Sequence, residues 1–215
     1  MSYQEQLDSG LVVVSTAAEH AEQLEALQRT VFLTLDPAER FRAEHYRHHV
    51  KLFPEGQFVV VDGDRVVGMT SAIRLDRDLE RMAGHTFAEV FAGGWLTSHD
   101  PDGAWLCGAD VGTHPRYRRR GIARALYRAR HDTVRRLGLR GQVTVGLMNG
   151  YGEVRREMSP AQYHRRLLAG ELEDPTVSAQ MHIGFEPRAL VRDYVDDPRC
   201  GNCGVLLVLA AERDV

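Results

Sequence analysis

The sequence predicts one α/β domain over residues 1–215, with a mixed sheet of about seven strands flanked by helices. Three observations predict this class. The length of 215 residues suits a single large domain. Segments with strand character alternate with segments of helical periodicity along the whole chain. No internal repeat or low-complexity linker divides the sequence into parts.

The first third of the chain predicts a strand followed by two helices. Residues 10–17 are rich in β-branched side chains after a glycine, which is typical of a strand. Apolar side chains at helical spacing follow in residues 17–32, and Ser15 or Thr16 is expected to cap that helix. A second helix is predicted over residues 36–53, because an Asp-Pro pair is typical of a helix start.

The middle of the chain predicts a hairpin, a long loop and a strand that leads into a long helix. Residues 53–76 have strand character on both sides of the Asp-Gly pair at 62–63, a dipeptide typical of tight hairpin turns. Residues 76–103 are glycine-rich and are expected to form a loop with one helical turn. A strand over 103–113 then precedes a helix over 118–138. The apolar stripe of that helix consists of Ile122, Ala125, Leu126, Ala129, Thr133, Val134 and Leu137.

The last third predicts three strands and two short helices. Residues 139–148 have strand character, and the insertion over 149–175 contains a helix that Ser159 would cap. A further short helix is expected to end at Gly184. Two more strands, over residues 185–195 and 204–211, close the chain.

Composition and charge narrow the class of function. The net charge is −3, so no overall positive field attracts nucleic acid. The chain lacks the run of roughly 18 apolar residues that a membrane helix needs. The first ten residues also lack the basic and apolar segments of a secretory signal. We therefore expect a cytoplasmic protein without a nucleic-acid or membrane partner.

No metal site is expected from the cysteines and histidines. Cys200 and Cys203 have CxxC spacing, but the second pair of ligands that a zinc site needs is absent. His45 and His49 share a helix face, yet neither a third ligand nor a glutamate base follows at motif spacing. Both pairs are interpreted as structural residues.

The stretch between the strand at 103–113 and the long helix carries the main functional signal. Four arginines crowd the five positions 116–120, and Gly121 follows at the start of the helix. The first N–H groups of a helix have no partner inside it, and the helix dipole adds partial positive charge there. A glycine lets a ligand approach that backbone closely. The stretch predicts an anion site suited to a pyrophosphate, and a solvated arginine face is the alternative.

The stretch VGTHPRYRRRGIARALY also resembles the acyl-CoA signature V-x-P-x-Y-R-x-x-G-x-G/A of the GNAT superfamily of N-acetyltransferases. Thr113 stands at the valine of the signature, and a GF pair at 184–185 matches a second landmark of the family. The order of predicted elements matches too, so the resemblance spans the whole chain. It implies a mostly antiparallel sheet whose fourth and fifth strands splay apart. The positions that match are Pro115, Tyr117, Arg118, Gly121 and Ala123.

By this resemblance the protein is an enzyme that moves an acetyl group from acetyl-CoA to a primary amine. The amine would belong to a small molecule or a peptide, no metal is implied, and the protein is expected as a monomer or a homodimer. Backbone groups of Val111 and Thr113 would bind the pantetheine arm, and the N–H groups from 119 to 123 would hold the pyrophosphate. The implied acyl-CoA site consists of Val111, Gly112, Thr113, Arg118, Arg119, Arg120, Gly121, Ile122 and Ala123.

The predicted catalytic residues are Asp110, Tyr151 and Gln180. Many members of the family carry a tyrosine, which acts on the leaving thiolate, at the position that Gln180 occupies here. Glutamine donates a hydrogen bond but is no useful acid, so Tyr151 and His182 are alternatives. The usual base positions correspond to Cys107 and Ala109, which cannot serve. Asp110 lies one step away, so we expect it to point away from the thioester and catalysis to rest mainly on positioning.

A protein of another class is the alternative reading. A GNAT fold that holds acyl-CoA without turnover would act as a sensor or an assembly partner, and the absent tyrosine favours this slightly. The insertions over 76–103 and 150–175 are expected to flank the acceptor mouth. They carry His85, Trp95, His99, Tyr151, Glu153 and Glu157.

Overall fold

The computed structural model describes residues 3–76 and 82–215. Within these residues the chain forms one eight-stranded sheet with the order β1-β2-β3-β4-β5-β6-β8-β7. Neighbouring strands are antiparallel except β5 and β6, which run parallel. The strands are β1 (Gln4–Gln6), β2 (Val12–Ser15), β3 (Gln57–Asp62), β4 (Arg65–Leu75), β5 (Trp105–Thr113), β6 (Gly141–Leu147), β7 (Glu186–Val191) and β8 (Gly204–Ala210).

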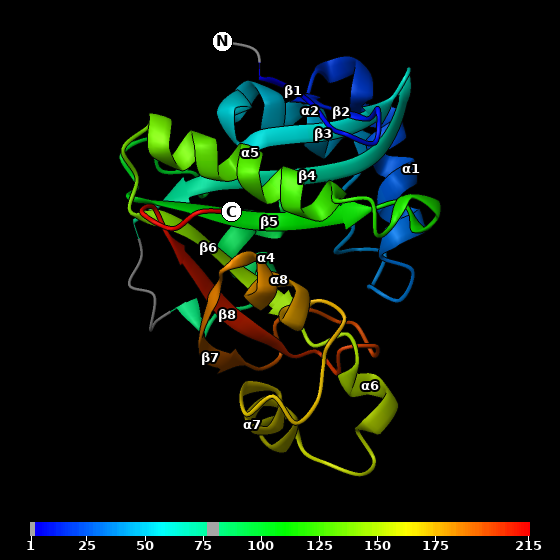
Figure 1. The fold of residues 1–215 in the computed structure, drawn as a ribbon, viewed down its shortest axis with the longest axis vertical. Coiled ribbons are helices and arrows are strands. Elements are labelled where there is room, and N and C mark those ends of the chain that lie inside the picture. Colours follow the sequence, from blue (N-terminus) through cyan, green and yellow to red (C-terminus); the bar gives the residue numbers. More distant parts are fainter. Residues whose placement is uncertain (1–2, 77–81) are drawn as a thin grey trace.

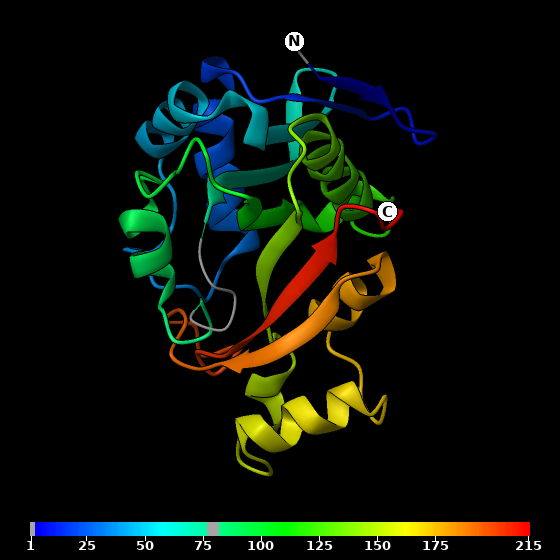
Figure 2. The ribbon, with the colours of Figure 1, turned by 90° about the vertical axis from the view of Figure 1, so that its left-hand side faces the viewer.

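Helices cover both faces of this sheet (Figure 1). Figure 2 shows α1 (Ala21–Val31) and α2 (Ala43–Leu52) on one face and α5 (Ile122–Arg136) on the other. The arrangement confirms the predicted GNAT-like, mostly antiparallel α/β sheet. Among the described helices, none is both long and apolar enough to cross a membrane. The remaining α-helices are α4 (Phe87–Phe91), α6 (Tyr151–Val154), α7 (Pro160–Leu168) and α8 (Val177–Ile183).

The N-terminal segment differs from the sequence-based expectation. Strand β1 was not predicted, because Gln-Glu-Gln carries no hydrophobic alternation. It extends the sheet by pairing with β2, and the ring of Tyr3 packs edge-on against Phe58 at 5.2 Å. Ser15 does not cap the following helix, since its hydroxyl accepts the backbone N–H of Tyr3 (2.9 Å). The ring of His20 instead accepts the N–H of Ala17.

The second helix begins seven residues later than predicted, at Ala43 rather than Asp36. The Asp36 carboxylate accepts the backbone N–H of Ala38 at 2.7 Å, which forms a local turn in place of a helix cap. The guanidinium of Arg40 donates to the carbonyls of Leu33 and Leu35, and Asp36 and Glu39 hydrogen-bond to the backbone of Asp196, so these contacts together hold the α1–α2 connection. Residues of this connection line part of a cavity between β5 and β6.

Several local predictions are confirmed. Gly63 has φ +57° in the turn between β3 and β4. Ser159 caps α7 and exchanges hydrogen bonds with Gln162 in a capping box. Gly184 ends α8 with φ +117°. Within the predicted loop over 76–103 the structure has α4 and a 3₁₀ turn, while residues 77–81 lie outside the described residues.

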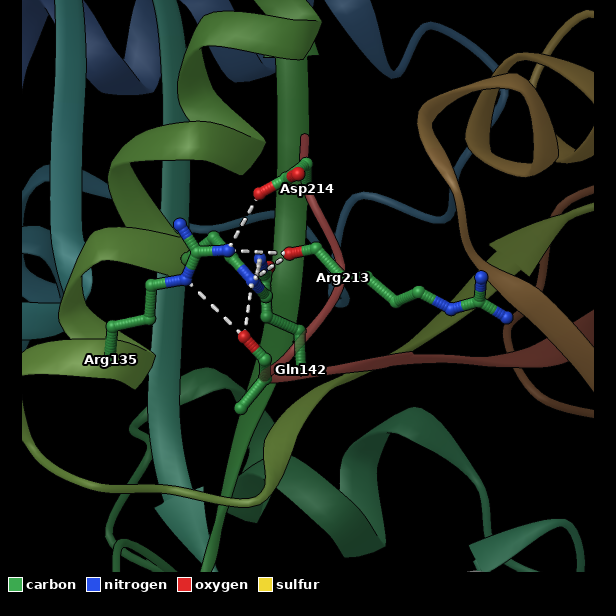
Figure 3. A network of polar contacts seen from close by, with 6 residues as sticks. Arg135, Gln142, Arg213 and Asp214 are labelled. Atoms are coloured by element: carbon green, nitrogen blue, oxygen red, sulfur yellow. Dashed lines mark hydrogen bonds and ion pairs between the residues drawn. The ribbon is translucent and has the colours of Figure 1, made fainter.

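Helix α5 is buried more widely than its predicted apolar stripe. Tyr127, Arg130 and His131 lie outside that stripe and are nevertheless buried. His131 is covered by the C-terminal tail, which lies along the same helix (Figure 3), while Tyr127 packs against Phe185 and Arg130 packs against Gly108 of β5. His131 and Arg135 contact the carbonyl oxygens of Ala211 and Arg213. The helix therefore has protein on two sides, and its polar side chains form part of the interior.

A buried carboxylate fixes the segment between β6 and α8. Asp174 is 1% exposed, and its Oδ2 accepts from the backbone N–H of Gly150 (2.9 Å) and the hydroxyl of Tyr163 (3.0 Å). Its Oδ1 accepts the N–H groups of Thr176 (2.8 Å) and Val177 (2.9 Å). The carboxylate of Asp174 is thus the hydrogen-bond acceptor for four donors.

We expect Asp174→Ala to lower the free energy of unfolding by about 3 kcal/mol, because several buried donors would lose their acceptor. The exposed neighbour Glu173, for which no hydrogen bond to another described residue is found, provides the control. Glu173→Ala should change the free energy by less than about 0.5 kcal/mol. Urea denaturation of both variants measures the difference, and equal midpoints would contradict this role of Asp174.

Candidate active site

The two parallel strands at the centre of the sheet separate partway along their length. Pairing between β5 and β6 runs from Trp105 and Gly141 to Gly108 and Thr144, and then stops. The last rung is reinforced by the Thr144 hydroxyl, which donates to the Gly108 carbonyl at 3.3 Å. Beyond it β5 keeps its pairing with β4 only, and β6 keeps its pairing with β8 only. The predicted splayed strand pair is therefore present at β5 and β6.

A β-bulge sits on β5 where the strands part. Ser71 of β4 pairs with Asp110, while the next residue of β4 pairs with Gly108, so Ala109 is the extra residue. The bulge places Ala109 and Asp110 on the same face of the sheet. Ala109 packs against the core under α1, and the Asp110 carboxylate accepts a hydrogen bond from Gln28 of α1. The expectation that Asp110 points away from this face is therefore wrong, since strict alternation fails at a bulge.

A cavity of about 350 Å³ occupies the space between the separated strands. It reaches from the α1 face, at Gln28 and Asp110, to the α5 face, at Tyr127 and Gln180. The α1–α2 connection and the segment between β7 and β8 line its mouth, which sequence reasoning had assigned to the two insertions. Each insertion nevertheless contributes some wall residues. The residues that line the cavity include Val31, Phe32, Leu35, Glu39, Phe41, Phe87, Val111, Thr113, Arg118, Ala123, Thr144, Asn149, Thr176, Tyr194, Asp197 and Arg199.

The carboxylate of Asp110 is partly exposed to this cavity and is held by three donors. Its Oδ1 accepts the N–H of Ser71 (2.6 Å). Its Oδ2 accepts from the Gln28 amide (2.7 Å) and the Tyr46 hydroxyl (3.3 Å). Desolvation raises the pKa of Asp110 to about 6, and the hydrogen bonds from Ser71 and Tyr46 oppose that shift. A carboxylate with this pKa is ionised at neutral pH and still basic enough to take a proton.

The arginine-glycine turn lies at the other end of the cavity. Arg119 and Gly121 have positive φ, +60° and +78°, and Gly121 is the N-cap residue of α5. No acceptor among the described residues takes the backbone N–H groups of Arg119, Arg120 and Gly121. A Cβ at Gly121 would meet nothing within 4 Å, so the backbone is open to a ligand. Free N–H groups, the helix dipole and open space suit a pyrophosphate.

Close packing positions this turn. A Cβ at Gly68 of β4 would lie 2.6 Å from the side chain of Ile122, so the first residue of α5 contacts the sheet directly. The Tyr117 hydroxyl donates to Asp62 at 2.7 Å, and the guanidinium of Arg120 lies over the Tyr117 ring at 5.1 Å. Of the predicted acyl-CoA residues, Val111, Thr113, Arg118 and Ala123 line the cavity, whereas Gly112 does not. It faces Met69 and lets α1 approach β5.

Gln180, which the family resemblance aligns with the usual tyrosine, lies on the wall of the cavity. Its side-chain amide donates to the hydroxyl of Tyr127 at 2.7 Å, while its Oε1 is buried without a hydrogen-bond partner among the described residues. Sequence reasoning did not single out Tyr127, because this tyrosine falls outside the apolar stripe of α5. The cavity therefore has a phenol on its wall, contributed by a different helix.

The other predicted groups lie away from the cavity. Tyr151 donates to the carbonyl of Met158 at 3.2 Å and packs against Tyr163, and His182 is exposed. Cys200 and Cys203 are buried free thiols in two different clusters, and burial raises the pKa of each, to about 12 for Cys200. In the described part of the chain, no three histidine, cysteine or acidic residues gather as metal ligands would.

Comparison with known proteins identifies the family. The model of the acetyltransferase (GNAT) family matches residues 21–149, more than half of the chain, so the chain belongs to this family. The probable hydrolase YhcX of Bacillus subtilis (strain 168) is 33% identical over 171 residues, which cover 80% of this chain and 33% of YhcX. This chain thus spans about a third of the length of YhcX. The uncharacterized N-acetyltransferase YkwB of the same organism is 28% identical over 187 residues, 86% of this chain and 82% of YkwB.

Solved structures share the fold. The GphF GNAT-like decarboxylase in complex with isobutyryl-CoA has a TM-score of 0.78 and 22% identity, covering 93% of this chain and 99% of that one. The loading GNATL domain of CurA from Lyngbya majuscula has a TM-score of 0.76 and 20% identity, covering 94% and 98%. Diaminobutyrate acetyltransferase EctA from Paenibacillus lautus, in complex with its substrate and coenzyme A, has a TM-score of 0.54 and 16% identity, covering 95% and 98%.

We expect Gly121→Glu to lower the affinity for CoA at least 10-fold, because it adds bulk and negative charge beside the free N–H groups. Gly138 provides a matched control, since it also has positive φ and open space but lies at the far end of α5. Gly138→Glu carries the same backbone strain and should bind CoA normally. Isothermal titration of CoA measures both, and equal affinities would place the pyrophosphate elsewhere.

Proposed function

We propose that this protein is an N-acetyltransferase that moves an acetyl group from acetyl-CoA to a primary amine by direct attack. The single observation that carries the proposal is the cavity through the gap between β5 and β6. It has Arg118 and Ala123 of the anion-binding turn at one end and the carboxylate of Asp110 on the opposite face. Pantetheine would lie along the unpaired edge of β5, with the thioester near the bulge.

The acceptor side of the cavity fits an apolar amine that carries positive charge. Its walls include the rings of Phe32, Phe41 and Phe87. The half-buried Glu39 and the buried Asp197 also line the cavity, together with Arg199, and burial raises the pKa of Glu39. Three carboxylates, of Glu39, Asp110 and Asp197, line the acceptor side of the cavity beside the guanidinium of Arg199, and this balance with the aromatic rings favours a cation over an anion. We therefore favour an alkyl amine or diamine over an acidic acceptor.

In this mechanism Asp110 acts as the base. The nitrogen lone pair of the amine forms a bond to the acetyl carbonyl carbon, and the carbon–sulfur bond breaks. The proton lost by the nitrogen passes to the Asp110 carboxylate, directly or through one water molecule. Placing both reactants in one cavity supplies much of the rate.

A panel of amines with acetyl-CoA tests the proposal. Hexylamine, 1,4-diaminobutane, glutamate and a short peptide with a free N-terminus cover the relevant chemistries. We expect release of free CoA thiol and an acetylated product with the first two, and little with glutamate. If CoA binds but no amine is acetylated, the protein would be a non-catalytic acyl-CoA binder instead.

The similarity to the GphF decarboxylase makes decarboxylation of an acyl-CoA a second candidate reaction. The observed cavity disfavours it, because Asp110 and Glu39 would repel the carboxylate of a substrate that loses carbon dioxide. Malonyl-CoA incubated without an amine provides the comparison. Conversion to acetyl-CoA faster than amine acetylation would show that decarboxylation is the activity.

We expect kcat/KM to rise with pH through about 6, because Asp110 must lose its proton to act as the base and its pKa lies near that value. Asp110→Asn should lower kcat by about 10²-fold and remove that rise. Asp132→Asn, on the exposed side of α5, is the control and should retain the wild-type kcat and the rise of kcat/KM with pH. A small loss in Asp110→Asn, with an unchanged pH profile, would leave positioning alone as the source of the rate.

A further inference from the structure

The hydroxyl of Tyr127 lies on the cavity wall opposite Asp110 and carries a proton without an acceptor. The oxygen accepts a hydrogen bond from the Gln180 amide at 2.7 Å. No other group among the described residues is found to accept the phenolic proton. Because Tyr127 and Gln180 both line the cavity, this proton is available to a bound ligand.

The position of Tyr127 is fixed at several points. Its backbone carbonyl accepts from the side chain of Gln142, a residue of β6 that also contacts His131 (Figure 3 shows Gln142 in this network). Its ring packs edge-on against Phe185 at 5.0 Å between the centroids. With its hydroxyl held by Gln180, the side chain has little freedom to turn away from the cavity.

A buried positive charge lies over the same ring. The guanidinium carbon of Arg130 is 5.3 Å from the centre of the Tyr127 ring, and Arg130 is 0% exposed. No hydrogen-bond acceptor among the described residues contacts its three nitrogen atoms. A Cβ on Gly108 would lie 2.2 Å from this guanidinium, so only glycine at the last rung of the β5–β6 pairing leaves room for it. Burial raises the pKa of Tyr127, and Arg130 acts in the opposite direction.

We propose that Tyr127 is the catalytic acid that protonates the leaving thiolate of CoA, a role that Gln180 cannot perform. This inference rests on the proposed acetyl transfer. As the carbon–sulfur bond breaks, its electron pair stays on sulfur, and the sulfur takes the phenolic proton. The resulting phenolate is stabilised by the N–H of Gln180 and by the charge of Arg130. Water then returns a proton to Tyr127, while Asp110 releases to water the proton taken from the amine.

This arrangement assigns separate walls to the two proton transfers. The base, Asp110, lies on the face covered by α1, where the amine enters. The acid, Tyr127, lies on the face covered by α5, from which the pantetheine sulfur is reached. Gln180 is then a positioning residue, because it holds the phenol through a hydrogen bond and does not itself give up a proton.

The test compares two leaving atoms in Tyr127→Phe, using the panel amine with the highest wild-type rate. With acetyl-CoA we expect kcat to fall about 10²-fold, the scale of a lost general acid, while the CoA affinity stays unchanged. With the selenoester analogue of acetyl-CoA the loss should nearly vanish, because a selenolate is a much weaker base and leaves without a proton. Equal losses with both donors would show a structural role, and no loss with acetyl-CoA would exclude Tyr127 as the acid.

Tyr163→Phe is the matched control, because Tyr163 has the same exposure of 3% as Tyr127 and also loses one hydrogen bond. It should retain the wild-type kcat with both donors, and thermal melting of both variants verifies that they fold. Failure of the wild-type protein to acetylate any amine would overturn the proposed function and this inference together. Wild-type turnover with an undiminished Tyr127→Phe would overturn this inference alone.

Gln180→Glu gives a second, independent measurement. The substitution keeps the size of the side chain but replaces the donor with a carboxylate that accepts the phenolic proton. We expect kcat with acetyl-CoA to fall at least 10-fold, and the selenoester to restore most of the rate. A Gln180→Glu protein with the wild-type kcat would show that the donor to Tyr127 has no part in the reaction.

Discussion

The end of pairing between β5 and β6 is the constraint on which the rest of the structure depends. Buried backbone N–H and C=O groups normally have partners, so two adjacent strands separate only where other contacts hold them apart. Here the Thr144 hydroxyl reaches the carbonyl of Gly108 at the last rung. The bulge at Ala109 then bends β5, and the carboxylate of Asp110 takes up the N–H of Ser71. The gap that remains supplies both the cavity and free backbone groups for a ligand.

Glycines make this gap possible from the α5 side. A Cβ at Gly108 would meet the guanidinium of Arg130, and one at Gly146 would lie 2.1 Å from the Oε1 of Gln180. Two polar side chains thus occupy space that strand side chains would otherwise fill. Burial lowers the pKa of Arg130, but a guanidinium remains charged. A charge without a hydrogen-bond partner among the described residues is costly, so the Arg130 guanidinium beside Tyr127 does not stabilise the fold by its charge.

The order of elements and the open turn before α5 were predictable because each rests on local chemistry. Gly121 and the arginines before it indicate a helix start, and Ser159 with Pro160 indicates another. Asp110 and Tyr127 were not predictable in the same way. A bulge reverses the alternation from which the direction of Asp110 was inferred, and no residue type marks it in the sequence. Tyr127 is buried because α8 and Phe185 cover a second side of α5, and that contact is between segments distant in sequence.

The two ends of the cavity between β5 and β6 differ in charge. Arginines and free N–H groups at the start of α5 favour the phosphates of a donor at one end, while Glu39 and Asp197 outweigh the charge of Arg199 and favour a cation at the other. The two reactants would therefore enter from different sides and meet at the bulge. A reversed arrangement would bring like charges together, which disfavours a misplaced ligand. The charges at the two ends of the cavity would thus help to position the two reactants, whereas the sequence led us to expect that the fold alone positions them.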